Sequence, residues 1–249
     1  MNSSRSVVLR GLLQSPEEWE VRNRVLVESL SQLAEKYLRN ATGRGLDVGC
    51  QYGSFTDRLN AHTSLAWEGI DPILTEQQES PQGATLHAAA ADSIPCPDCH
   101  FDCLILANVF EHIPPDLRYA SFKEMRRVLQ PGGIIVGQIP NPYFPIESHS
   151  RLPFMGWLPI SLREKYWRLA PVPWQGNSPW EHNFFAVTTR HLKAEAARAG
   201  FQVVTVENFN YPVTALPKAV RPLAVTFSVP MKRFPWAWQF VLRRPAEDS

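Results

Sequence analysis

Two glycines, Gly49 and Gly53, lie four residues apart directly after a short apolar stretch that ends at Val48. Glycine adopts backbone angles that other residues avoid, and it lets the main chain approach a ligand closely. Ser54 follows, and Asp57 comes three residues later, a pairing typical of a helix start. Because the first turn of a helix leaves N–H groups without partners, the spacing predicts a strand, a tight turn and a helix that together hold a polar ligand.

An acid follows the next apolar stretch, residues 65–70. It is Asp71, which lies roughly 20 residues beyond the glycine turn, the spacing of one strand–helix–strand step. In open α/β sheets, an acid at the tip of the second strand commonly accepts ribose hydroxyls. A carboxylate that accepts two hydrogen bonds holds them strongly and with a defined geometry. On its own, such an acid would more often cap a helix, so the ligand-binding interpretation depends on the neighbouring motifs.

Five motifs follow one another along the chain, at residues 47–53, 68–71, 91–92, 108–113 and 127–133. In this order they resemble the class I S-adenosylmethionine-dependent methyltransferases, most closely the small-molecule branch with its type 11-like domains. The likeness covers residues 45–133 and resumes weakly over 188–206. Gln51 departs from it, because the family usually has glycine there, and we expect its polar side chain to lie near the ligand and to reshape the loop slightly.

The resemblance implies that S-adenosylmethionine binds where the strands end. Asp47 would help to hold its ammonium group, Asp71 would accept both ribose hydroxyls, and Asp92 would accept from the adenine amino group. Asn108 would face the methionine part. The implied cofactor-binding residues are Asp47, Gly49, Cys50, Gln51, Tyr52, Gly53, Asp71, Pro72, Ala91, Asp92, Ser93 and Asn108.

Three histidines are candidate catalytic residues. Methyl transfer is an in-line displacement, in which alignment of the nucleophile supplies much of the rate. An oxygen acceptor also benefits from a base, and histidine is the usual one near neutral pH. His112 follows the fourth predicted strand, whereas His149 and His182 lie in a later aromatic segment, with Glu147 as an alternative base. Each histidine also has a plainer interpretation as a structural or surface residue.

A cysteine-rich stretch suggests a different chemistry. Cys96, Cys99 and His100 match the attachment pattern of c-type haem, and with Cys103 they suggest a zinc site. Haem attachment takes place outside the cytoplasm, and the chain shows no export signal. No second cysteine pair is available to complete a zinc site. We therefore expect reduced thiols and no bound metal.

The elements that must position these residues alternate between strand and helix. Residues 101–108 form an almost unbroken apolar run, as expected of a buried parallel strand. The pattern predicts an α/β fold, and the resemblance implies a Rossmann-like, seven-stranded, mostly parallel sheet with helices on both faces and an antiparallel last strand. Helices are predicted over 16–38, 54–61, from Pro114 and Pro115 to the glycines at 132–133, and over 188–199; strands are predicted over 45–48, 65–70, 85–89, 101–108, 134–139, 201–206 and 236–242.

Residues 140–183, which we call the aromatic cap, interleave prolines with tyrosine, phenylalanine and tryptophan. We expect an insertion after the fifth strand, within a single domain over residues 1–249. An apolar concave surface with a few polar groups suits an organic ligand. The plainer interpretation is that these rings pack the insertion onto the domain.

Composition narrows the class of function. With a net charge of +1 the chain has no basic field for nucleic acid. No apolar run approaches the ~18 residues of a membrane span, and no signal peptide is evident, so we expect a cytoplasmic protein that could still touch a membrane surface. The oligomeric state is left open.

Together these features predict an S-adenosylmethionine-dependent methyltransferase. Its acceptor would be an oxygen, or in second place a nitrogen or carbon, of a small organic, glycan or lipid-linked molecule. One rival is a quinone or polyketide C- or O-methyltransferase. Another is an inactive cofactor-binding partner protein, for which Gln51 is the one hint.

Overall fold

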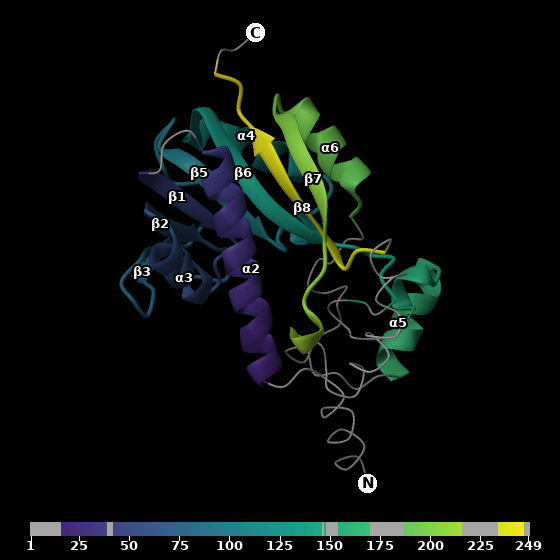
Figure 1. The fold of residues 1–249 in the computed structure, drawn as a ribbon. Helices are drawn as coiled ribbons and strands as arrows, with labels where there is room; N and C mark the ends of the chain where they lie inside the picture. Colours follow the sequence, from purple (N-terminus) through teal and green to yellow (C-terminus); the bar gives the residue numbers. More distant parts are fainter. Residues whose placement is uncertain are drawn as a thin grey trace.

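The computed structural model describes residues 16–38, 42–145, 147, 154–169, 187–215 and 234–246. In this part of the chain, helices and strands build one sheet that is covered on both faces (Figure 1). The strands are β1 Gly43–Val48, β2 Leu65–Ile70, β3 Gln78–Glu79, β4 Thr85–His87, β5 Phe101–Ala107, β6 Leu129–Pro140, β7 Gln202–Phe209 and β8 Ala237–Arg243. The helices are α2 Pro16–Tyr37, α3 Ser54–His62, α4 Arg118–Val128, α5 Ile160–Leu169 and α6 Thr189–Arg198, with short 3-10 turns η1 Phe110–His112, η2 Met155–Trp157 and η3 Val213–Ala215.

The strand order is β3-β4-β2-β1-β5-β6-β8-β7. β8 runs antiparallel to both of its neighbours, and β4, β2, β1, β5, β6 and β7 share one direction. The predicted mostly parallel sheet with an antiparallel last strand is confirmed, but it has eight strands and not seven. The additional strand, β3, pairs antiparallel with β4 through only two residues. Both are polar and exposed, so they carry no hydrophobic alternation that sequence analysis could detect.

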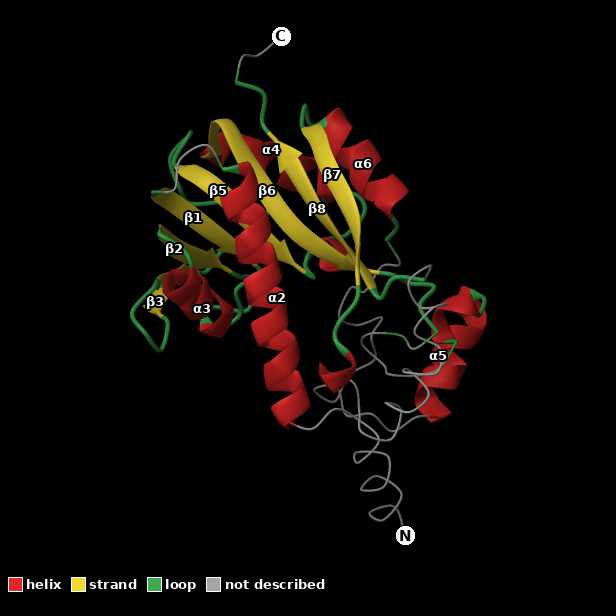
Figure 2. Cartoon of the chain, viewed as in Figure 1, coloured by secondary structure: helices red, strands yellow, loops and turns green. Residues whose placement is uncertain are grey.

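Figure 2 shows the sheet between two layers of helices, with α2 and α3 on one face and α4 and α6 on the other. Leu30 of α2 packs in the same core as Trp67 of β2. Phe122 of α4 and Leu192 of α6 belong to a second core on the opposite face. Residues 103–106 of β5 are buried between these layers, as their apolar run predicted. The order of the sheet brings the carboxyl ends of β1, β2, β4 and β5 to one edge.

The start of α3 differs from the predicted side-chain cap. The N-cap residue is Gly53, in a left-handed conformation, and Ser54 is the first helical residue. Asp57 makes no cap; its carboxylate accepts hydrogen bonds from the Ser80 hydroxyl and, at 3.2 Å, from the N–H of Gln82. The acid therefore ties α3 to the segment before β4, a long-range contact that the local spacing could not reveal.

The predicted bounds of α4 were also wrong. The helix begins at Arg118, because Pro114 and Pro115 lie in the preceding turn. It is followed directly by β6, so Gly132 and Gly133 lie inside that strand and do not end the helix. Pairing of Leu129 with β5 starts the strand early, a tertiary contact that outweighs the local tendency of glycine to end a helix.

Part of the aromatic cap can be seen beyond the end of β6. α5 lies apart from the two helical layers (Figure 1). The side chains of Tyr143, Phe154 and Trp157 are 52%, 51% and 55% exposed. Trp157 Nε1 donates to the carbonyl of Tyr143 at 2.8 Å, and its ring lies 5.0 Å from that of Phe154. His149 and His182 lie outside the described residues. Within the described ranges, no helix is both long and apolar enough to cross a bilayer.

Candidate functional site

The glycine turn follows β1 at the carboxyl edge of the sheet. Gly49 and Gly53 take left-handed backbone angles, with φ of 81° and 84°. The N–H groups of Gly49 and Cys50 donate to the carbonyl of Ile70, at 2.8 and 3.1 Å, and tie the turn to the end of β2. A Cβ on Gly49 would lie 2.5 Å from Cγ2 of Val109. The turn therefore needs glycine here both for its backbone angle and for this close approach.

Gln51 takes a backbone conformation that favours glycine. Its φ is 52°, an angle that costs an ordinary L-residue about 1–2 kcal/mol. Its N–H donates to Oδ2 of Asp71 at 2.8 Å, while its side chain is exposed to solvent. The turn thus keeps left-handed geometry without the family's usual glycine, and the hydrogen bond to Asp71 offsets part of the strain.

Asp71 lies at the end of β2 and is held by main-chain groups on both sides. While Oδ2 accepts from Gln51, Oδ1 accepts from the N–H of Ile73 at 2.8 Å. The residue is buried. Each carboxylate oxygen has two lone pairs, so both keep capacity for a further donor. The carboxylate is therefore fixed in orientation beside the glycine turn and can accept two ligand hydroxyls.

Asp47, near the end of β1, is a buried acid beside the same turn. Thr56 of α3 donates its hydroxyl to Oδ2 at 2.7 Å. Burial raises the pKa of Asp47 to about 7; the Thr56 hydrogen bond opposes this shift, and the charge of Asp71 adds to it. A positively charged group placed here would favour the ionised form, so the site suits an ammonium ion.

The turn after β4 lies next to Asp71. The N–H of Asp71 donates to the carbonyl of His87 at 3.2 Å, which joins the ends of β2 and β4. Ala91 and Asp92 are half-buried in this turn, and Ser93 is exposed. The structure therefore places Asp92, the residue predicted to contact adenine, and its neighbours Ala91 and Ser93 after the carboxyl end of β4, at the same sheet edge as the glycine turn.

The remaining predicted cofactor-binding residues differ in how far their side chains are exposed. Cys50 is buried in a small cluster with Leu74 and Leu86, and burial raises the pKa of its thiol. Its sulfur donates to the carbonyl of Gln51 at 3.6 Å, so the thiol is packed beneath the turn. Tyr52 is 60% exposed, and Pro72 is exposed as well. These two side chains line the open rim.

Asn108 begins a chain of polar side chains that the sequence analysis missed. Gln138 Nε2 donates to Asn108 Oδ1 at 3.1 Å and to the hydroxyl of Tyr211 at 3.0 Å. Gln239 Nε2 donates to Gln138 Oε1 at 3.3 Å, and Ser29 of α2 donates to Gln239 Oε1 at 2.8 Å. This chain, Asn108–Gln138–Gln239–Ser29 with Tyr211, orients Asn108 at the end of β5.

A signal for this chain was present in the sequence. Gln138 and Gln239 each interrupt an otherwise apolar strand, and they face each other in the β6–β8 register. Buried amides of this kind need hydrogen-bond partners. The sequence did not show that β6 and β8 pair, because the two glutamines lie about a hundred residues apart. This pairing makes each glutamine the hydrogen-bond partner of the other.

His112 lies in η1, directly after β5, and is half-buried near the same edge as Asn108. Glu147 is buried. The structure thus places one of the three candidate bases at the same sheet edge as the glycine turn. The other two, His149 and His182, fall outside the described residues and stay predictions.

Residues 19–206 match a family described as a methyltransferase domain. The chain belongs to this family. It is a class I S-adenosylmethionine-dependent methyltransferase, and S-adenosylmethionine is its cofactor. Among curated proteins, the chain is similar to the ubiquinone/menaquinone biosynthesis C-methyltransferase UbiE of Pseudomonas paraeruginosa, with 30% identity over 142 residues. That match covers 54% of this chain and 51% of the relative, so the chain spans about half the length of the curated relatives it matches.

Solved structures share the fold. An S-adenosylmethionine-dependent methyltransferase from Mesorhizobium loti superimposes with a TM-score of 0.55 at 18% identity, over 86% of this chain and 96% of that one. The [4+2]-cyclase SpnF superimposes with a TM-score of 0.54 at 17% identity, over 88% and 82% of the two chains. One of these proteins is a methyltransferase and the other a cyclase, so likeness of fold does not by itself identify the reaction.

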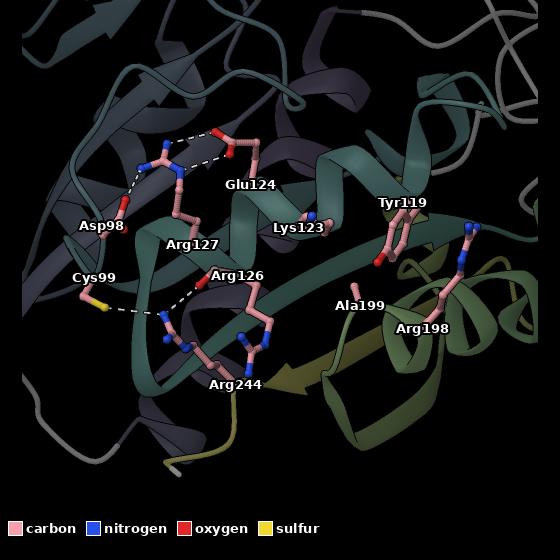
Figure 3. Close-up of a pocket in the computed structure, with 10 residues that line it drawn as sticks. All are labelled: Asp98, Cys99, Tyr119, Lys123, Glu124, Arg126, Arg127, Arg198, Ala199 and Arg244. Atoms are coloured by element: carbon pink, nitrogen blue, oxygen red, sulfur yellow. Dashed lines mark hydrogen bonds and ion pairs between the residues drawn. The ribbon is translucent and has the colours of Figure 1, made fainter. Parts of the chain in front are cut away.

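A cavity of about 510 Å³ lies at the other edge of the methyltransferase sheet, where α4 and α6 end (Figure 3). Two of the arginines that line it, Arg127 and Arg244, form hydrogen bonds within the protein. Arg127 donates to Asp98 Oδ1 at 2.6 Å and to Glu124 Oε2 at 2.8 Å. Arg244 donates to the sulfur of Cys99 at 3.4 Å and to main-chain carbonyls at the end of α4. Because the strands begin at this edge, the cavity is remote from the glycine turn and is not the candidate cofactor site. It is lined by Asp98, Cys99, Tyr119, Lys123, Glu124, Arg126, Arg127, Arg198, Ala199 and Arg244.

We expect the affinity of the methyltransferase for its demethylated cofactor to rise with pH and to level off above about 7. The pKa of Asp47 is raised to about 7. Below that value the carboxyl must lose a proton before it can pair with the ammonium group that the sequence predicts it to hold. Affinity should therefore rise by up to about tenfold per pH unit below the pKa. Calorimetric titration at several pH values measures this dependence.

The raised pKa of Asp47 also makes the free energy of unfolding depend on pH. Between its unfolded pKa near 3.8 and its folded pKa of about 7, Asp47 keeps its proton only in the folded state. The cofactor-free protein should therefore lose stability as pH rises through this window. Asp47→Asn is the control and should flatten both dependences. A pH dependence of binding that persists unchanged in Asp47→Asn would mean that another group titrates.

Proposed function

We propose that this methyltransferase moves the methyl group of S-adenosylmethionine to an oxygen of a small organic, glycan or lipid-linked acceptor. One observation carries the cofactor part of the proposal. The Asp71 carboxylate is held by two main-chain N–H groups beside a turn with left-handed Gly49 and Gly53. A fixed acceptor for two hydroxyls next to an exposed turn suits a ribose.

The residues of the chain would mainly bind and align. Asp47 would pair with the ammonium group, and Asp71 would hold the ribose. Asn108, oriented by Gln138, would contact the methionine part. His112 is the proposed base for the proton of an acceptor hydroxyl. Alignment of the acceptor oxygen with the methyl carbon would then supply much of the rate.

The aromatic cap supports an organic acceptor. Tyr143, Phe154 and Trp157 expose their rings just beyond β6, on the same side of the sheet as the glycine turn. Apolar surface with a few polar groups is typical of sites for organic ligands.

A second candidate is methyl transfer to a ring carbon of a quinone precursor. The observation that favours it is the likeness to a quinone-biosynthesis C-methyltransferase, which extends over about half of each protein. Carbon methylation needs an electron-rich ring but no hydroxyl nucleophile. In this case His112 would act on the proton that leaves the ring carbon.

One experiment tests both candidates. Calorimetry first measures binding of S-adenosylmethionine and of its demethylated product, for which we expect dissociation constants in the micromolar range, about −7 to −8 kcal/mol. The protein is then incubated with methyl-labelled donor and an extract of organic metabolites. Mass spectrometry of the labelled product separates O-methyl from C-methyl groups. Absence of heat with both ligands would contradict the proposed function.

Trp157→Ala is expected to leave cofactor affinity nearly unchanged and to lower turnover of the acceptor found in this way. The reason is that Trp157 lies in the aromatic cap, exposed and with its ring tilted against that of Phe154, and not in the glycine turn. Trp157→Phe is the control, because it keeps an aromatic ring, although a smaller one, and loses the hydrogen bond to the carbonyl of Tyr143. If Trp157→Ala weakens cofactor binding and turnover in equal proportion, the residue belongs to the cofactor site or the core.

A further inference from the structure

Three side chains with metal-binding atoms converge, and none of them is among the predicted cofactor-binding residues. They are Glu68 of β2, His87 of β4 and Cys96 in the segment before β5. One donor atom of each lies within 4.8 Å of the donors of the other two. β2 and β4 are neighbours, and His87 pairs with Ile70, two residues beyond Glu68. Because alternate residues of a strand share a face, Glu68 and His87 project from the same side of the sheet.

We propose that Glu68, His87 and Cys96 form a zinc site with a fourth position open to water. A thiolate, an imidazole nitrogen and a carboxylate oxygen are the ligand types that zinc takes in proteins. The thiolate disfavours magnesium and calcium, which prefer oxygen ligands alone. The charges of one thiolate and one carboxylate balance those of a divalent ion.

The arrangement is already partly organised. His87 Nε2 and Glu68 Oε2 lie 3.0 Å apart, and their side chains are only 16% and 23% exposed. A zinc ion would replace the proton shared by this pair. His100 lies at the margin, with Nε2 3.9 Å from Glu68 Oε1 and also hydrogen-bonded to the guanidinium of Arg44. Arg44 adds a positive charge nearby, so the two anionic ligands are needed for a cation to bind.

The proposal replaces the expectation of no metal, which considered only ligands close together in sequence. The sequence pattern pairs Cys96 with Cys99, but Cys99 is exposed and its sulfur accepts from Arg244, on the side of the remote cavity. Cys103 is buried in the core formed with α2. The other two ligands are Glu68 and His87. They come from strands, and neither has a characteristic sequence spacing to Cys96.

The site has a consequence for the segment between two of its ligands. His87 and Cys96 flank residues 88–95, which include Ala91 and Asp92. A metal bound at both ends would restrict this segment. Given the proposed function, it would also limit the motion of the adenine contacts, whereas the metal site itself does not depend on that function.

Cobalt(II) is a direct probe, because it takes the place of zinc and gives absorption bands that report a bound thiolate. The full chain, freed of metal and kept reduced, should bind one equivalent of cobalt with a thiolate-to-metal band that zinc abolishes. Cys96→Ser should lose the band. His87→Gln should weaken cobalt binding by more than about 100-fold, beyond the loss typical of a residue outside the ligand sphere.

Cys99→Ser is the matched control and should bind cobalt like the parent. Thermal unfolding without metal establishes that each variant folds, and zinc should raise the unfolding temperature of the parent and of Cys99→Ser but not of Cys96→Ser. The proposal is overturned if the parent shows no thiolate band. It is equally overturned if the band persists in Cys96→Ser, or if it is lost in Cys99→Ser and kept in His87→Gln.

Discussion

Asp71→Ala is expected to weaken binding of S-adenosylmethionine by roughly 1.5–3 kcal/mol, about 10- to 150-fold, because hydrogen bonds to a charged group are lost. The structure adds a second reason. The carboxylate also accepts from the N–H groups of Gln51 and Ile73, so its removal leaves both without that partner and loosens the turn. Asp71→Asn should do less harm, since one amide oxygen still accepts. Titration calorimetry on the folded variants measures the loss.

Asp102→Ala is a matched control for this experiment. Asp102 lies at the start of β5, on the opposite edge of the sheet, and its carboxylate accepts from the N–H of Arg44 at 2.9 Å. Its removal costs a similar bond to the main chain without touching the glycine turn, so cofactor affinity should not change. An equal loss in both variants would point to general loosening of the sheet. If Asp71→Ala binds like the parent, Asp71 does not hold the ribose.

Gly53→Ala is expected to lower the free energy of unfolding by about 2–5 kcal/mol. Its φ of 84° is left-handed, which costs alanine about 1–2 kcal/mol. The new Cβ would also lie 2.6 Å from the Cβ of Ser80 and 2.9 Å from Cδ1 of Leu86. Overpacking of this kind costs about 1–3 kcal/mol more. Urea denaturation of the cofactor-free protein measures the sum.

Gly83→Ala separates the two contributions. Its φ of 88° is almost the same, but a Cβ there would meet no atom of the described residues within 4 Å. It should therefore lose only the part due to the backbone angle, about 1–2 kcal/mol. The difference between the two variants gives the cost of the clash at Gly53. Equal losses would show that Ser80 and Leu86 move aside, and the turn would then be less closely packed than its geometry indicates.

Local patterns in the sequence predicted most of the elements. The apolar run predicted over 101–108 is β5, which ends one residue earlier, and the short strand before Asp71 is β2, with the bounds expected. Both follow from hydrophobic periodicity, which depends only on near neighbours. The prediction failed where one local pattern is compatible with two different structures. Ser54 and Asp57 have the spacing of a capping pair, but the N-cap residue is Gly53. Asp57 instead contacts the segment before β4.

In the candidate cofactor site, too, the positions of residues could be predicted from the sequence, but their orientation and protonation could not. The glycine turn and Asp71 could be placed from sequence, because a strand, a turn and the next strand lie within one local unit. The orientation of Asp71 could not, since it depends on hydrogen bonds from Gln51 and Ile73. The raised pKa of Asp47 is likewise a result of burial, which a sequence position does not state.

By itself, the sequence determined the family, the order of most strands and helices along the chain, and the turn that begins the candidate cofactor site. Only the tertiary structure brought Gln138 to Gln239, and Glu68 and His87 to Cys96. The physical reason is the order of the sheet, in which β4 lies beside β2 and β8 beside β6. That order follows from the packing of whole faces and not from the spacing of any residues along the chain.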